Sequence, residues 1–395
     1  NVLTVGIVWF GAHKIDQGTM QVGSMTAFIT YAMMIVMAFL MLAAMSIMLP
    51  RAAVAAERID EVIRTQSSIA EPMQPEKIKE HRGVICFSHV NFRYPNAQED
   101  VLSDIDFVAE PGKTTAIIGS TGCGKSTLGR TILGLAPATE GEILFHGKSI
   151  VGLSSREQKH LYRDMQLVFQ DPYSSLNPRF CVFDLIAEPL RVYKACKNQE
   201  ELHQRVLELM DTVGLAHRLA YAYPHELDGG RCQRIGIARA LAMNPQFIVC
   251  DEPVSALDVS IQAQILNLLQ DLQEQNGLAY MFITHDLSVV RYISDDIMVM
   301  YVGTVVEKSS AEELFEHPLH PYTQGLLSAI PLPVIDQPAA QVILQGEITS
   351  PVNPKPGCRF ADRCPHATEA CTKSQPELKE VSPNHFVACH NLGTF

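Results

Sequence analysis

The stretch GSTGCGKST at residues 119–127 decides the fold class of this chain. It follows a short apolar stretch, KTTAIIG, and precedes LGRTILGL, whose composition is typical of a helix. Strand, loop and helix match G-x-x-x-x-G-K-[ST], in which glycines let successive N–H groups turn toward phosphate oxygens. The lysine neutralises the β- and γ-phosphates, and the next hydroxyl binds Mg²⁺. We therefore predict a nucleotide site formed by Gly119, Ser120, Thr121, Gly122, Cys123, Gly124, Lys125, Ser126 and Thr127.

Polar side chains follow three further apolar strands, at the end where open α/β sheets bind their ligands. In FIVCDEP, Asp251 stands at the end of the apolar strand and Glu252 follows it. We predict that Asp251 completes the Mg²⁺ site with Ser126 and that Glu252 polarises the attacking water. Gln170 in LVFQDP and His285 in MFITHD also terminate apolar strands. For these two residues a structural role in the loop, or in a helix cap for His285, stays open beside a catalytic role.

Apolar strands alternate with helical segments, which favours a mainly parallel sheet. The stretch VICFSHVNFRYP at 84–95 alternates like an exposed edge strand. SIQAQILNLLQDLQEQNG has helical apolar spacing, with Ser260 as the predicted N-cap and Gly277 as the predicted stop. Residues from about 175 to 245 are mostly helical in pattern and predict a helical subdomain.

The stretch YPHELDGGRCQR at 223–234 places two glycines before an apolar helical run. Gly229 and Gly230 would let backbone N–H groups converge on an anion. Asp228, which precedes them, repels an anion but is a favourable helix cap. A phosphate site and an ordinary capped helix both stay open from the residues alone.

Residues 17–50 contain no charged side chain. Within them, VGSMTAFITYAMMIVMAFLMLAAMSIML is long enough to cross a bilayer, with a buried helix of a soluble protein as the alternative. Basic residues follow from Arg51, which favours the cytoplasmic side for that end. A polar, proline-containing linker is expected over residues 67–82.

The overall composition limits the partners. Lys and Arg number 31 against 43 Asp and Glu, a net charge of −12, so we expect no nucleic-acid partner. Of the ten cysteines, six are scattered and four lie after residue 357. Scattered cysteines are typical of a reducing compartment.

The chain resembles the nucleotide-binding domain of ABC transporters over residues 82–320. The resemblance rests on six motifs that occur in this order: GSTGCGKST, LVFQDP, LDGGRCQR, FIVCDEP, SALD and MFITHD. The resemblance implies an α/β P-loop NTPase fold of ABC type, with a mainly parallel sheet core, an antiparallel β edge and a helical subdomain. A transmembrane helix would precede it and a small Cys-rich module would follow. It also implies that Tyr94 stacks on adenine, that Gln170 binds Mg²⁺ and senses the γ-phosphate, and that His285 positions that phosphate and the water.

The same resemblance implies a dimer, identical or mixed, that sandwiches two ATP molecules. Each site would combine the phosphate loop of one domain with Asp228, Gly229 and Gly230 of the other, and SALD at 255–258 would lie at the interface. The family pattern at 227–231 is Leu-Ser-Gly-Gly-Gln, from which Asp228 and Arg231 depart. Two functions therefore stay open: an ATP-hydrolysing transport subunit, or an ABC-type ATPase that binds ATP but is impaired in hydrolysis.

The resemblance changes along the chain. Residues 1–122 resemble an exporter half-transporter, through RAAVAAERIDEVI and FRYPNAQEDVLSDIDFVAEPGKTTAIIGSTG. Residues 123–395 resemble the ATP-binding subunit of oligopeptide/dipeptide importers, through LVFQDPYSSLNPR, HPLHPYTQGLLSAIP and CRFADRCPHATEAC. An exporter-type half-transporter fragment is therefore a further alternative.

Four cysteines near the C-terminus share the spacing C-x5-C-x6-C-x17-C: Cys358, Cys364, Cys371 and Cys389. Four thiolates suit either a tetrahedral Zn²⁺ or an iron–sulfur cluster, and four unrelated thiols are the third possibility. The resemblance to importer subunits implies a [4Fe-4S] cluster, with Zn²⁺ as the second choice.

We therefore expect four regions: the end of a transmembrane domain at 1–66, a linker at 67–82, an ABC nucleotide-binding domain at 83–330 and an importer-type Cys-rich module at 331–395. The expected function is ATP hydrolysis, with ATP and Mg²⁺, coupled to transport of peptides or related solutes. Expected partners are a second nucleotide-binding domain, transmembrane permease subunits and membrane lipid. The expected location is the inner (plasma) membrane, with the nucleotide-binding domain on the cytoplasmic face.

Overall fold

The computed structural model describes residues 2–64, 83–95, 97, 99–330, 346 and 354–392. The predicted linker at 67–82 lies outside the described residues. The chain divides into two units, residues 1–70 and 71–395, and each is described by itself.

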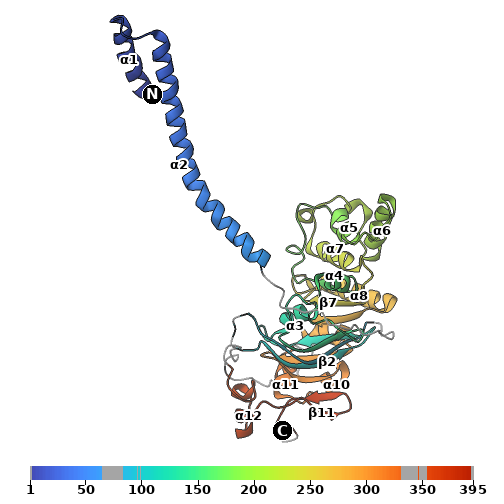
Figure 1. Cartoon of the computed structure of the whole chain (residues 1–395). Helices are drawn as coiled ribbons and strands as arrows, with labels where there is room; N and C mark the ends of the chain where they lie inside the picture. Colours follow the sequence, from blue (N-terminus) through green and yellow to red (C-terminus); the bar gives the residue numbers. More distant parts are fainter. Residues whose placement is uncertain are drawn as a thin grey trace. The chain divides into compact units, whose positions relative to one another are not determined.

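The first unit consists of two helices, α1 (Val2–Asp16) and α2 (Val22–Arg64) (Figure 1). Within α2, Val22–Ser46 is long and apolar enough to cross a membrane, with a mean hydropathy of 2.3 and none of its most apolar window buried. Phe28, Phe39 and Leu42 are each more than 60% exposed. An apolar helix without a polar face needs either a protein core or lipid around it, and the described part of this unit provides no core.

The second unit is built on an eight-stranded sheet with the order β11-β12-β10-β9-β3-β8-β7-β6. Its strands β9, β3, β8, β7 and β6 are parallel, which confirms the predicted parallel core. β3 lies in the middle, and all five of its residues are buried. The bounds are β3 (Thr114–Ile118), β6 (Met165–Val168), β7 (Phe247–Asp251), β8 (Ala279–Ile283), β9 (Asp296–Tyr301), β10 (Thr304–Ser310), β11 (Lys379–Ser382) and β12 (His385–Val387).

A second, antiparallel sheet has the order β2-β1-β4-β5. Its strands are β1 (Ile85–Phe92), β2 (Leu102–Ala109), β4 (Glu140–Phe145) and β5 (Lys148–Ser149). The prediction that β1 is an edge strand is wrong, because β1 pairs with β2 on one side and β4 on the other. Alternation reports which face of a strand is buried and not its place in the sheet. Phe87 and Phe107 stack across β1 and β2 with ring centroids 4.6 Å apart.

Three helices form the helical subdomain: α5 (Val182–Val192), α6 (Gln199–Thr212) and α7 (Gly229–Leu241). Figure 1 shows them grouped at one end of the second unit. Their apolar faces share one buried cluster, which includes Leu185, Val206 and Ile237. The other α-helices of the described residues in this unit are α3 (Lys125–Ile132), α4 (Ser155–Asp164), α8 (Val259–Asn276), α9 (Leu287–Ile293), α10 (Ala311–Glu316), α11 (Pro321–Ser328) and α12 (Glu369–Lys373).

The predicted N-cap of α8 is wrong by two residues. Asp258, not Ser260, caps the helix, since its carboxylate accepts a hydrogen bond from the Ile261 N–H. The Ser260 hydroxyl instead donates to Asp258 Oδ1. A carboxylate suits the positive helix end better than a hydroxyl does. Gly277 ends α8 in the left-handed conformation, as predicted.

The C-terminal segment joins the main sheet of the second unit. β12 pairs antiparallel with β10 and also with β11. The His385 and Val387 side chains of β12 are fully buried. This segment therefore extends the main sheet of the second unit.

Candidate functional site

The glycine-rich loop joins β3 to α3 at the carboxyl end of the central strand. Gly119, Gly122 and Gly124 have φ values of 152°, 81° and 101°, which L side chains rarely adopt. A Cβ on Gly119 would also collide with the Met300 carbonyl oxygen. The N-terminus of α3 has no side-chain cap, so its N–H groups remain available to an anion.

Lys125 points back into this loop. Its side chain is only 6% exposed, and Nζ donates to the carbonyl oxygens of Gly119 and Ser120. A buried ammonium that donates its hydrogen bonds to neutral carbonyl groups favours an anion nearby. The loop is thus a built anion site of the type that binds nucleotide phosphates.

Asp251 and Ser126 meet at the end of β7. The Ser126 hydroxyl donates to Asp251 Oδ1 at 2.9 Å. Burial raises the pKa of the Asp251 carboxyl, and the Ser126 hydrogen bond partly offsets that rise. A hydroxyl and a carboxylate this close can share one Mg²⁺.

The three remaining predicted catalytic residues lie together. Gln170 Nε2 donates to Glu252 Oε2 at 2.8 Å, and His285 Nδ1 lies 3.1 Å from Glu252 Oε1. Glu252 has a positive φ of 49°, and its N–H donates to the Ile283 carbonyl oxygen of β8. The backbone around Glu252 is therefore fixed, with its carboxylate held at both oxygens.

Tyr94 lies beside the phosphate loop. Its hydroxyl is 3.5 Å from Thr127 Oγ1, and its ring packs edge-on against Phe92 at 4.9 Å. The side chain is 47% exposed, so part of the ring is open to a flat partner.

The Gly-Gly helix α7 begins with an internal cap. The Asp228 carboxylate accepts a hydrogen bond from the Arg231 N–H at 2.8 Å and lies 3.4 Å from Arg231 Nε. A Cβ on Gly230 would lie 2.6 Å from Ile261 Cγ2 of α8. In the single chain the second glycine serves helix packing, and the Asp228 carboxylate accepts from the N–H of Arg231, the third residue of α7.

One hydrogen bond of the phosphate loop is not predicted by any sequence motif. The Tyr322 hydroxyl, from α11, accepts a hydrogen bond from the Ser120 N–H at 2.8 Å. The two residues are 202 positions apart, and no motif links them.

The four C-terminal cysteines gather in one region without a disulfide. Asn391 contacts two of the sulfurs: its N–H lies 3.4 Å from Cys389 Sγ and its Nδ2 lies 3.6 Å from Cys371 Sγ. Burial, with smaller contributions from the other three thiols, raises the pKa of Cys358 to about 11. The thiols are therefore close enough to influence one another.

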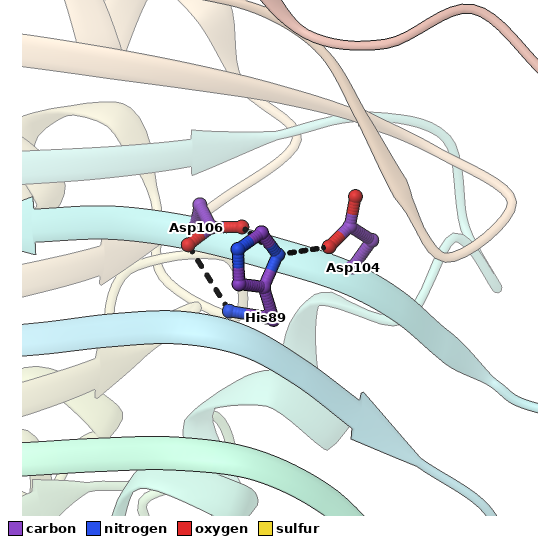
Figure 2. Close-up of side chains that lie close together, drawn as sticks. All are labelled: His89, Asp104 and Asp106. Atoms are coloured by element: carbon purple, nitrogen blue, oxygen red, sulfur yellow. Dashed lines mark hydrogen bonds and ion pairs between the residues drawn. The ribbon is translucent and has the colours of Figure 1, made fainter.

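A separate polar cluster, His89, Asp104 and Asp106, lies on the antiparallel sheet (Figure 2). His89 Nδ1 is 2.7 Å from Asp104 Oδ1 and 3.2 Å from Asp106 Oδ2. The hydrogen bond to Asp104, with the charges of both carboxylates, raises the pKa of His89. The His89 and Asp104 side chains are mostly exposed, and the three groups satisfy one another, so this cluster adds nothing to the nucleotide site.

Comparison with known proteins connects this geometry to a family. The ABC transporter family matches residues 102–255, and the C-terminal region of the oligopeptide/dipeptide transporter family matches residues 306–371. The oligopeptide transport ATP-binding protein OppF of Escherichia coli (strain K12) is 50% identical over 280 residues, which are 70% of this chain and 84% of that protein. AppF of Bacillus subtilis (strain 168) is 50% identical over 292 residues, which are 73% of this chain and 88% of that protein.

The chain belongs to the family of oligopeptide transport ATP-binding proteins. It is an ABC-type ATPase, and the alternative of impaired hydrolysis has no support in these comparisons. None of the relatives named here is described as an exporter, so they do not support the exporter resemblance of residues 1–122. The ABC match also runs continuously across residue 122.

Two solved structures share the fold of this ABC ATPase. The cbiO1 protein from Clostridium perfringens has a TM-score of 0.55 and 28% identity, covering 60% of this chain and 92% of that one. The dimeric ATP-binding cassette MJ0796, described in a post-hydrolysis state with ADP and Pi, has a TM-score of 0.53 and 31% identity. It covers 57% of this chain and 98% of its own.

Proposed function

We propose that this ABC ATPase hydrolyses ATP to drive the import of oligopeptides or related solutes. The observation that carries the proposal is Glu252, held by Gln170 and His285 beside the Ser126–Asp251 pair and the phosphate loop. The named relatives are oligopeptide transport proteins, which supports peptides as the transported class.

The proposed mechanism assigns one task to each group. Lys125 and the N–H groups of the loop would hold the phosphates, and Ser126, Asp251 and Gln170 would hold Mg²⁺, which neutralises phosphate charge when it is bound. The Glu252 carboxylate accepts a proton from the attacking water while the water oxygen bonds to the γ-phosphorus, the bond from that phosphorus to the β–γ bridging oxygen breaks, and ADP leaves. His285 keeps that carboxylate and the γ-phosphate in position. Tyr94 stacks on the adenine.

The proposed assembly is a dimer of nucleotide-binding domains with permease subunits. MJ0796 is described as dimeric, which supports a dimer of this chain with itself or with a related domain. In that dimer Asp228, Gly229 and Gly230 would face the partner's ATP, and Arg231 would compensate the charge of Asp228.

We propose that Val22–Ser46 lies in lipid, with the nucleotide-binding domain on the cytoplasmic face of the inner membrane. The support is the exposure of apolar side chains along this helix. Alkaline extraction of membranes tests it: the chain should stay in the pellet, whereas an Ile35→Lys/Leu40→Lys variant should be released. Release of the unaltered chain would contradict a spanning helix.

For the C-terminal cysteines we propose a [4Fe-4S] cluster, with Zn²⁺ as the second choice. Tetrahedral Zn–S bonds of about 2.3 Å would place the sulfurs about 3.8 Å apart. Among the described residues, the cysteines do not bring three sulfurs within 4.8 Å of one another. Ligands spread over several irons lie farther apart than the ligands of one zinc ion, which is why we place the cluster before Zn²⁺ for Cys358, Cys364, Cys371 and Cys389. When bound, the cluster would supply a redox-active cross-link.

The metal assignment has a direct test. After anaerobic purification, we expect iron, acid-labile sulfide and visible absorption, all lost in a Cys358→Ser/Cys371→Ser variant. Zinc without visible absorption would contradict the cluster. No bound metal would show that the four thiols are unrelated to metal binding.

Transport is tested with the chain and its permease subunits in proteoliposomes that enclose ATP. Labelled oligopeptide should accumulate in the vesicles only when ATP is inside, and a Glu252→Gln variant should abolish the accumulation. ATP-driven release of peptide loaded inside would instead favour the exporter alternative.

A further inference from the structure

We infer that Tyr322 and the pair Arg359–Phe360 are positioning residues of the phosphate loop, so that ATP affinity depends on the docked C-terminal segment. The inference rests on the proposed ATP site at Lys125 and gives the C-terminal segment a role in it.

The first contact fixes a single peptide unit of the loop. The peptide bond between Gly119 and Ser120 carries the Gly119 carbonyl and the Ser120 N–H. Lys125 Nζ donates to that carbonyl, and the Tyr322 hydroxyl accepts from that N–H. The unit is therefore held at both ends, by the phosphate-binding lysine and by a tyrosine that is only 1% exposed. Removing the hydroxyl would leave this plane held by Lys125 alone.

An aromatic cluster holds the Tyr322 ring. Its centroid is 4.7 Å from the Tyr301 ring and 5.5 Å from the Phe360 ring. Tyr301 and Phe360 pack edge-to-face at 5.2 Å. Such pairs have specific geometry, so Phe360 restricts where the Tyr322 hydroxyl can lie.

A buried carboxylate fixes the backbone that enters α11. Glu307 is fully buried and accepts hydrogen bonds from the Leu319 and His320 N–H groups, at 2.7 Å and 3.0 Å. The His385 Nε2 atom of β12 lies 2.8 Å from the same carboxylate. The C-terminal segment thus supports Tyr322 in two ways. Phe360 packs on the Tyr322 ring, and His385 contacts the Glu307 carboxylate that binds the backbone at the start of α11.

The second contact reaches the other side of the loop. The Arg359 guanidinium donates to the Val302 carbonyl oxygen and, at 2.8 Å, to Ser103 Oγ. Gly303, which follows Val302 in the chain, donates its N–H to the Cys123 carbonyl oxygen of the loop at 2.8 Å. Two consecutive residues of the C-terminal segment therefore support the loop at Ser120 and at Cys123.

The decisive variant is Tyr322→Phe in the full chain, because it removes only the hydroxyl. We expect the Kd for MgATP, measured by titration calorimetry, to rise about five- to tenfold, as loss of one buried hydrogen bond predicts. The KM for ATP should rise by the same factor, with kcat changed less than twofold. Phe360→Leu keeps the hydroxyl but loosens its support, and it should raise the Kd about two- to fivefold.

Tyr280→Phe is the matched control. Tyr280 is fully buried in β8, and its hydroxyl has no hydrogen-bond partner among the described residues. Its removal should leave the Kd within twofold. A merely structural role of Tyr322 would instead lower the melting temperature and kcat at unchanged KM.

A Lys125→Ala variant distinguishes a failure of the positioning role from a failure of the proposed ATP site. If it abolishes ATP binding while Tyr322→Phe and Phe360→Leu stay within twofold of the native chain, the positioning role is wrong and the ATP site stands. If Lys125→Ala binds ATP as the native chain does, the proposed ATP site itself is wrong.

Discussion

The Gln170 side chain donates a 2.8 Å hydrogen bond to Glu252 Oε2 at the carboxyl end of β7. His285 Nδ1 lies 3.1 Å from the other carboxylate oxygen. A carboxylate held at both oxygens loses little further freedom when it takes a proton from a water. We therefore propose that the three residues act as one unit, in which Gln170 and His285 orient Glu252.

Alanine substitutions at two loop glycines compare the stability cost of a positive φ with the added cost of a steric clash. Gly119→Ala should cost about 3 kcal/mol or more, because its Cβ collides with the Met300 carbonyl oxygen in addition to a positive φ. Gly122→Ala should cost about 1–2 kcal/mol, since it has a φ of 81° but no atom within 4 Å of the new Cβ. Urea unfolding of both variants checks the order. Equal costs would show that the close approach at Gly119 is unimportant.

Asp228 and Arg231 should behave as a coupled pair in hydrolysis. Arg231→Gln alone should lower kcat/KM about tenfold, because it leaves the Asp228 carboxylate facing the partner's phosphates without compensation. The double variant Asp228→Ser/Arg231→Gln should return to within about threefold of the native chain, and Asp228→Ser alone should change little. Steady-state ATPase rates of the native chain, the two single variants and the double variant form a double-mutant cycle. Effects that simply multiply would show that the two residues act independently.

The buried pair of His385 and Glu307 should make stability depend on pH. The Glu307 hydrogen bond raises the pKa of His385, and Glu313 at 3.5 Å adds to the rise. Cys389 lies near the same carboxylate, and burial lowers the pKa of His320 to about 4. Because the folded state favours protonated His385, its stabilisation is complete below about pH 6.5 and is lost as pH rises through the raised pKa.

His385→Gln measures this contribution. We expect it to cost about 1–3 kcal/mol at pH 6 and less at pH 9, from urea unfolding at each pH. His317→Gln is the control, since His317 pairs with Glu313 on the surface and should contribute under about 1 kcal/mol. A cost of His385→Gln that does not change with pH would rule out a charged pair.

Much of the site was predictable because its residues follow apolar strands. Asp251 ends β7, Glu252 follows it directly, and His285 lies two residues after β8; parallel pairing of β7 and β8 brings these positions together. Local spacing cannot show contacts made over long sequence separations. The Tyr322 hydrogen bond to Ser120 and the pairing of β12 with β10 both depend on how the C-terminal segment folds back. Local sequence patterns also gave two wrong predictions. They do not determine the order of strands in a sheet, which places β1 between two neighbours, and they did not distinguish Asp258 from Ser260 as the cap of α8.

The most direct test of the central claim is the ATPase rate and MgATP affinity of Glu252→Gln beside the native chain. Glu274→Gln, an exposed glutamate on α8, is the control and should change neither quantity. The account predicts that Glu252→Gln lowers kcat about 10²–10⁴-fold while the Kd for MgATP stays within about threefold. A Glu252→Gln chain that hydrolyses ATP at the native rate would contradict the account.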